Sequence, residues 1–151
     1  MAIAYIGMGL PGAGKTTYLV KLAQLIDAHY ICADDIRAEI YGSAEIQKDH
    51  ARVWSIVHQR ASAAIDSGKD VVIDGTHIKK ADRKATIKSC KAASKIHLIW
   101  LKTPYHLCLK RNSARDKVVP EDVITKMKWQ LEQQPPLNSE GFNELEIIYS
   151  S

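Results

Sequence analysis

The chain lacks the features that mark membrane, secreted or disulfide-stabilised proteins. No apolar stretch approaches the 18 residues that a membrane-spanning helix needs, and the N-terminus has neither the charged nor the apolar segment of a secretory signal. Cys32, Cys90 and Cys108 are odd in number and widely spaced, which argues against a disulfide framework and against a zinc site. We therefore expect buried thiols and a cytoplasmic protein.

Repeats, low-complexity segments and linkers are also missing, and the six histidines show no metal-ligand spacing. The 151 residues are expected to form a single domain, 1–151, with one core. Hydrophobic residues make up 46% of the sequence and charged residues 25%, as in an ordinary globular protein. The net charge is only +4, so it does not by itself identify a nucleic-acid partner.

A glycine-rich motif follows the first apolar segment. Residues 9–17, GLPGAGKTT, fit the pattern GxxxxGK[ST] directly after a strand expected at 2–8. In such a loop, backbone N–H groups surround phosphate oxygens, and the next helix adds roughly half a positive charge. Lys15 is expected to reach the β- and γ-phosphates of ATP and Thr16 to hold Mg²⁺. The predicted nucleotide-binding residues here are Gly9, Pro11, Gly12, Ala13, Gly14, Lys15, Thr16 and Thr17.

Two other interpretations use the same residues. Residues 7–12 read GxGxxG, and Asp34 lies about 20 residues further on, as in a dinucleotide-binding fold. That fold has no use for the Lys15-Thr16 pair, and the chain keeps turning through residues 11–14. A glycine turn that merely links a strand to a helix is the other alternative.

Strands and helices alternate along the chain. This order predicts an α/β fold with a parallel sheet, and together with the glycine-rich motif it predicts the three-layer sandwich of a P-loop NTPase. Strands are expected at 2–8, 30–33, 71–74, 96–101 and 145–149, and helices at 15–28, 34–41, 45–67, 79–94, 105–115 and 120–134.

Ligands bind beyond the carboxyl ends of the strands in such a sheet, where several polar residues are expected. Asp34 and Arg37 are three residues apart and share a helical face, and Asp34 is the predicted general base for an attacking hydroxyl. Either Asp34 or Asp35 is also expected to cap the helix. Asp74 closes an apolar strand and is the predicted carboxylate near Mg²⁺, with a residue that only caps the following turn as the alternative. The glutamate that often activates water does not follow it, which favours transfer over hydrolysis.

Basic residues gather in the second half of the chain. Arg111 and Arg115 share a predicted helical face and form either a clamp on the γ-phosphate or a solvated surface. A stripe of lysines at helical spacing suits a nucleic-acid backbone, with a solvated face as the alternative. The stripe consists of Lys80, Lys84, Lys88, Lys91 and Lys95.

The succession of motifs from residue 3 to about residue 134 resembles the kinase domain of bacteriophage-type 5′-hydroxyl polynucleotide kinases. The motifs are GLPGAGKTT at 9–17, DDIR at 34–37, VIDGT at 72–76, RNSAR at 111–115 and VPEDVI at 119–124.

This resemblance implies an adenylate-kinase-like fold with a short helical lid near residues 110–120, and it implies roles for individual residues. Lys15 and Thr16 would bind nucleotide and metal, and Asp34 would be the general base. Arg37 would contact the acceptor phosphate, and Arg115 on the lid would contact the donor phosphates. Gly75 and His77 depart from the family pattern, which leaves the acceptor contacts at these two positions open.

The sequence therefore predicts an ATP-dependent phosphotransferase that acts on a hydroxyl of a nucleic acid, DNA or RNA, at a 5′ end. One alternative is a kinase of a nucleoside or another small metabolite. An alternative of another class is a nucleotide-binding switch or ATPase module.

Overall fold

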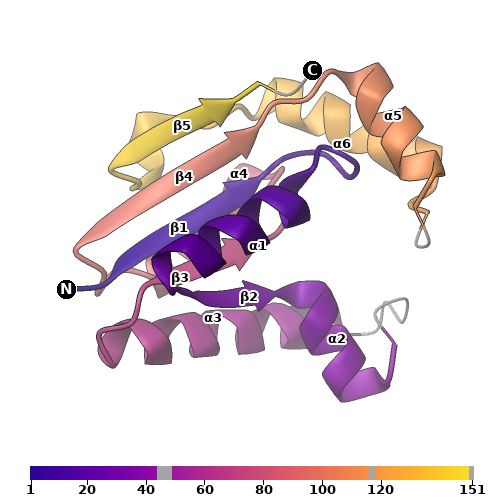
Figure 1. Cartoon of the computed structure of the whole chain (residues 1–151). Coiled ribbons are helices and arrows are strands. Elements are labelled where there is room, and N and C mark those ends of the chain that lie inside the picture. The colour runs from indigo at the N-terminus through magenta and orange to yellow at the C-terminus, as the bar shows by residue number, and fades with distance from the viewer. Residues whose placement is uncertain (44–48, 116–117, 150–151) are drawn as a thin grey trace.

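The five predicted strands form one parallel sheet. The computed structural model describes residues 1–43, 49–115 and 118–149. The strand order is β2-β3-β1-β4-β5, and every neighbouring pair is parallel. The predicted fold class is confirmed (Figure 1). The strands are β1 (Ile3–Met8), β2 (His29–Cys32), β3 (Val71–Asp74), β4 (Lys95–Leu101) and β5 (Glu144–Ile148).

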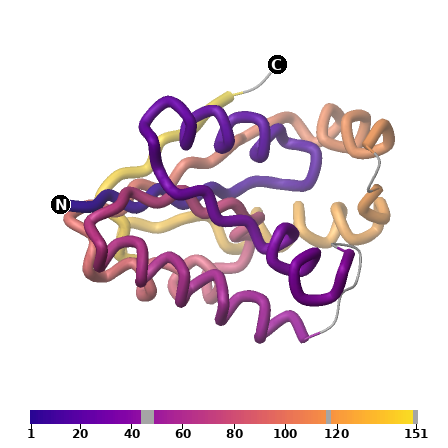
Figure 2. Tube along the Cα trace, turned by 60° about the horizontal axis from the view of Figure 1, so that its bottom comes forward, coloured from indigo at the N-terminus to yellow at the C-terminus, as the bar shows by residue number. Residues whose placement is uncertain are grey.

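Helices cover both faces of the sheet. Figure 2 shows α1 on one side of the strands and α3 on the other. Near the carboxyl ends of the strands lie α2, α5 and α6 (Figure 1). No helix in the described part of the chain is long and apolar enough to cross a membrane. The helices are α1 (Lys15–Ile26), α2 (Ala33–Tyr41), α3 (His50–Asp66), α4 (Lys80–Ser89), α5 (Tyr105–Ser113), α6 (Glu121–Gln133) and the short 3₁₀ helix η1 (Asn138–Glu140).

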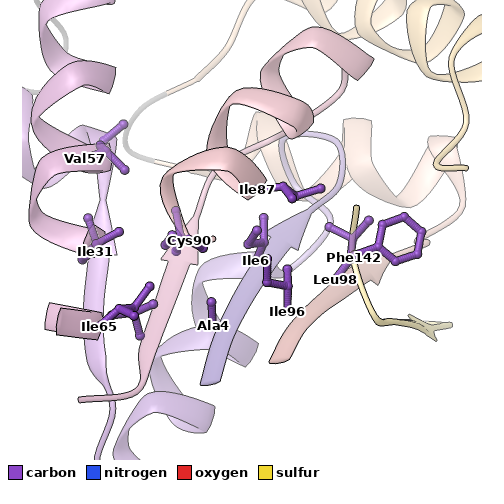
Figure 3. Close-up of a cluster of buried hydrophobic side chains, with 14 of the residues drawn as sticks. Ala4, Ile6, Ile31, Val57, Ile65, Ile87, Cys90, Ile96, Leu98 and Phe142 are labelled. Carbon is purple, nitrogen blue, oxygen red and sulfur yellow. The ribbon is translucent and has the colours of Figure 1, made fainter. Parts of the chain in front are cut away.

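The core lies on both faces of the central strands because each face is covered by helices. Ala4 and Ile6 of β1 pack on the side of α3 and α4, together with Val57 and Ile87 (Figure 3). A second cluster on the other face includes Leu19 of α1. The interior strand β3 is buried along its whole length, which explains why its sequence is an unbroken apolar run that ends in Asp74.

Helix α3 begins at His50, where Asp49 caps it. The Asp49 carboxylate accepts a hydrogen bond of 3.2 Å from the backbone N–H of Arg52, as an N-cap does. The sequence predicted a helix from residue 45; residues 45–48 lie outside the described residues. The Asp49 cap fixes where the first turn of α3 begins, and therefore where His50 lies.

The prediction of a helix up to residue 94 is wrong, because α4 ends at Ser89. Ser94 bonds the carbonyl of Ala2 through both its backbone N–H, at 2.8 Å, and its hydroxyl, at 3.0 Å, and these bonds lead the chain into β4. Lys91 follows the helix, and Lys95 lies in β4, 2.5 Å from the Glu144 carboxylate.

The predicted lysine stripe is corrected by the same observation. Only Lys80, Lys84 and Lys88 lie on α4, so five lysines do not share one helical face. The sequence spacing of Lys91 and Lys95 continued the helical period by coincidence.

A fully buried arginine fastens α4 to the end of α6. The Arg83 side chain forms two hydrogen bonds with the Glu140 carboxylate, at 2.7 and 3.0 Å. It also donates to the carbonyls of His77, Ile78 and Gln134. Both charged side chains have no solvent exposure. Because every charge here is paired and bonded, removing one partner leaves the other buried without compensation.

We predict that Arg83→Met lowers the free energy of unfolding by about 3–5 kcal/mol, since Glu140 then stays buried and unpaired. Urea denaturation followed by circular dichroism measures it. The matched control is Arg60→Met, which breaks the exposed Arg60–Glu39 pair and should change stability little. Equal losses of unfolding free energy in the two variants would contradict the conclusion that the buried Arg83–Glu140 pair stabilises the fold.

Candidate active site

The phosphate loop runs from the end of β1 to the first turn of α1. Gly12 and Gly14 have φ of 84° and 94°, so the loop uses a left-handed backbone that glycine adopts readily. A Cβ on Gly12 would lie 2.3 Å from the carbonyl oxygen of Cys108, which shows how closely α5 packs against the loop. The Thr103 hydroxyl donates to the Ala13 carbonyl at 2.7 Å. These contacts hold the loop in shape.

Lys15 lies at the start of α1, and its Nζ donates to the carbonyl of Leu10 across the loop at 3.2 Å. Burial lowers the pKa of this ammonium, and the Asp74 carboxylate opposes that shift. An ammonium held inside a glycine loop is placed to interact with phosphate oxygens, which replace the lost hydration. The geometry fits the role predicted for Lys15.

Thr16 and Asp74 meet at the base of the loop, as the predicted metal pair requires. The Thr16 hydroxyl donates to Asp74 Oδ2 at 2.9 Å, and the Tyr30 hydroxyl donates to the same oxygen at 2.5 Å. Asp74 is buried. The burial of Tyr30, together with its hydrogen bond to Asp74, raises the pKa of the Tyr30 hydroxyl. Tyr30 is a contact that the sequence prediction missed.

The oxygen donors of this corner fit a hard cation. Among the described residues no group of three His, Cys, Asp or Glu side chains converges on one point. A hydroxyl and one carboxylate suit Mg²⁺, which usually keeps several waters and takes its other ligands from phosphates. The residues that would hold it are Thr16 and Asp74.

Asp34 and Arg37 lie on α2, on the opposite side of the same cleft. Arg37 Nη1 donates to Asp34 Oδ1 at 2.7 Å, so the predicted pair shares a face. The Arg37 side chain is 6% exposed, whereas that of Asp34 is 51% exposed. The prediction that Asp34 or Asp35 caps the helix is wrong, because the N-cap residue is Cys32 and no side chain bonds there. Asp34 therefore does not serve as the N-cap of α2.

The two predicted lid arginines lie beside the phosphate loop, but they do not share a helical face. Helix α5 ends at Ser113, so Arg115 follows the helix, and both arginines line the cleft. Arg111 Nη1 is 3.5 Å from the Ala13 carbonyl. Residues 116–117 of the predicted lid lie outside the described residues.

Asn112 was not predicted, and it joins the two described ends of the lid. Its amide donates to the Val119 carbonyl at 2.7 Å and accepts from the Val119 N–H at 3.0 Å. Val118, Val119, Val123 and Met127 then give the cleft an apolar wall on the lid side. An asparagine inside a helix gives no sequence signal for such a role.

His77 links β1 to α4 and does not line the cleft. Its Nδ1 donates to the Gly7 carbonyl at 2.7 Å, and its Nε2 is 3.0 Å from the Thr86 hydroxyl. The Thr86 hydroxyl also lies 3.0 Å from His58 Nε2. Burial lowers the pKa of His77 to about 4, so the ring stays neutral at pH 7 and has a structural role through these hydrogen bonds.

Gly75 leaves room for Trp54 of α3. A Cβ at residue 75 would lie 2.6 Å from Cη2 of the indole, and both residues line the cleft. The departure at Gly75 therefore accompanies an aromatic side chain from another helix. Trp54 was not among the predicted site residues.

Most of these residues line one cleft of about 1080 Å³, whereas Gly9, Ala13, Tyr30, His77 and Asn112 do not line it. Its walls come from the phosphate loop, α2, the start of α3, the loop after β3 and the lid side of α5 and α6. A model of a family described as AAA domain matches residues 5–134. The chain belongs to this family.

Solved structures of similar fold include a chain of an RNA repair complex and two small-molecule kinases. The Pnkp1/Rnl/Hen1 RNA repair complex contains a chain with TM-score 0.77 and 21% identity; the match covers 87% of this chain and 44% of that one. A sugar kinase from Janibacter has TM-score 0.72 and 17% identity, with 99% and 86% covered. Shikimate kinase from Acinetobacter baumannii has TM-score 0.63 and 22% identity, with 100% and 86% covered. At these identities the likeness shows a P-loop kinase fold.

We predict that Gly12→Ala lowers nucleotide affinity more than tenfold, because the new Cβ meets the Cys108 backbone. The control is Gly42→Ala: φ there is 80°, but nothing lies within 4 Å of the added Cβ. That variant should lose about 1 kcal/mol of stability, from backbone strain alone, and keep its nucleotide affinity. Calorimetric titration with ATP and urea denaturation separate the two effects. Equal affinities in the two variants would contradict this account of the loop.

Proposed function

We propose that the protein is an ATP-dependent kinase that transfers the γ-phosphate to a hydroxyl of a nucleic acid, at a 5′ end. The observation that carries this proposal is the pairing of Asp34 and Arg37 across the cleft from Lys15 and Thr16. The donor phosphates would lie in the loop, and the acceptor between Asp34, Arg37 and Trp54.

In the proposed reaction the acceptor oxygen attacks the γ-phosphorus as the bond from the γ-phosphorus to the bridging oxygen breaks, and ADP leaves. Arg37 occupies Oδ1 of Asp34, so Oδ2 is the oxygen that would take the hydroxyl proton. Mg²⁺ at Thr16 and Asp74 would neutralise charge on the β- and γ-phosphates. Lys15, Arg111 and Arg115 would stabilise the charge that develops during transfer.

Two features of the acceptor side support a nucleic acid. The buried guanidinium of Arg37 suits an acceptor phosphate, because arginine binds phosphate through two parallel N–H donors. Trp54 supplies an aromatic ring on which a nucleobase would stack. The cleft, at about 1080 Å³, lies just above the roughly 300–1,000 Å³ range of ligand pockets, which leaves space for two substrates.

A small-metabolite kinase is the second candidate. Lys15 is the only lysine that lines the described part of the cleft, so the lysines of α4 give the acceptor site no added positive charge. A compact acceptor needs only the few polar groups already present beside Asp34. The nature of the acceptor therefore has to be measured.

We predict that Asp34→Asn lowers the transfer rate by roughly 10²–10⁴, the usual contribution of a general base, with ATP affinity unchanged. The matched control is Asp35→Asn. Asp35 lies on the same helix turn but does not line the cleft, so this variant should keep near wild-type rates. Lys15→Ala should lose turnover with both donor and acceptor in excess. Rates with γ-labelled ATP provide the measurement. A large loss in Asp35→Asn but not in Asp34→Asn would contradict the assignment.

We predict that Trp54→Ala raises the KM of a 5′-hydroxyl oligonucleotide by roughly tenfold or more, because base stacking contributes about 1–3 kcal/mol. Trp129→Ala is the control, since Trp129 lies on α6, is 61% exposed and does not line the cleft. The assay compares 5′-hydroxyl DNA, 5′-hydroxyl RNA and small alcohols.

Transfer to small alcohols but to no oligonucleotide would favour the metabolite kinase. ATP hydrolysis with no transfer to any acceptor would favour a switch or ATPase module.

A further inference from the structure

The guanidinium of Arg37 is held from two sides. Its Nη1 donates to Asp34, and its Nη2 lies 2.7 Å from Nδ1 of His50, the first residue of α3. Arginine carries only donors, so Nδ1 of His50 must be the acceptor and carry no proton. The ring is then neutral, with its proton on Nε2.

We propose that His50 is a positioning residue for the acceptor: its unprotonated Nδ1 holds the Arg37 guanidinium against Asp34, so that protonation of His50 weakens acceptor binding. This inference rests on the proposed function, because it takes the acceptor to bind at Arg37 and Asp34. It concerns a residue of another helix, outside the motifs that define the phosphate loop and α2.

Among the described residues, the hydrogen-bond partners of the Arg37 side chain are Asp34 and His50. Its Nε is buried and has no partner in that part of the chain. Gly75, which lines the same cleft, has no side chain to offer. Loss of the His50 contact therefore leaves the guanidinium, among the described residues, with the hydrogen bond from Nη1 to Asp34 only.

Protonation would reverse the interaction. A proton on Nδ1 turns the acceptor into a donor that faces another donor, and it adds a positive charge beside Arg37. Partial burial and the charge of Arg37 lower the pKa of His50 below its ordinary value of 6.5. The other charged groups that act on it are Lys79, which also lowers the pKa, and Asp82 and Asp34, which raise it. His50 is neutral at pH 7, and acceptor binding weakens as the pH falls through its pKa.

The test measures acceptor KM and kcat from pH 8 to pH 5 in the wild type, His50→Asn and His50→Ala. The wild-type KM should rise on the acid side. His50→Asn keeps an oxygen acceptor that does not titrate, so its KM should stay near the wild-type value at pH 8 and stay flat. His50→Ala should raise KM at every pH by roughly tenfold to a hundredfold, the cost of a hydrogen bond to a charged group.

The control is His58→Asn on the same helix. His58 forms a hydrogen bond with Thr86 and does not line the cleft, so this variant should keep the wild-type rise of KM at acid pH. An acceptor KM that falls at acid pH would overturn the inference, because His50 would then bind an anionic acceptor directly as a cation. A profile of His50→Ala identical to that of the wild type would also overturn it.

Nitrogen NMR of the nucleotide-free protein tests the contact without any reaction. His50, assigned by its loss in His50→Asn, should show an unprotonated Nδ1 at pH 8. A protonated Nδ1 would overturn the inference even if transfer to an acceptor is found. If no acceptor takes phosphate, the proposed function fails, and the Nδ1 signal alone decides whether His50 holds Arg37.

Discussion

The hydrogen bonds to Asp74 bring together three parts of the chain that the cleft needs. Thr16 from the start of α1 and Tyr30 from β2 both donate to one carboxylate oxygen at the end of β3. A buried carboxylate requires such partners, because a bare charge in the core is costly. The same bonds set the distance between the phosphate loop and β2, and α2 with Asp34 and Arg37 follows β2 directly.

Next to this corner, polar contacts link the chain after β3 to β1 and α4. His77 bridges the Gly7 carbonyl and Thr86, and Arg83 bonds the carbonyls of His77 and Ile78. The chain after β3 is therefore fixed on both sides, although it has no regular secondary structure there. This arrangement places Gly75 against Trp54 and gives the acceptor side of the cleft its aromatic wall.

Much of the fold was predictable, because local rules and burial agree along most of the chain. The unbroken apolar run of β3 and the glycine loop before α1 predicted both elements correctly. The exceptions are places where distant contacts decide. Ser94 bonds Ala2 and leads the chain into β4 after α4 has ended, and Asp49 caps α3 at His50. Neither contact follows from helical periodicity, so the lysine stripe and the end of α4 were predicted wrongly.

The sequence by itself determined the phosphate loop, the parallel α/β order and the carboxylate that closes β3. These features depend on residues close together in the chain, where glycine, lysine and hydrophobic spacing act directly. The tertiary structure decided which groups surround Arg37 and Asp74. Tyr30, His50, Trp54 and Asn112 become neighbours of the cleft only when separate elements pack. A side chain between packed helices and strands carries no local pattern, because the partner that gives it a role lies far away in the sequence.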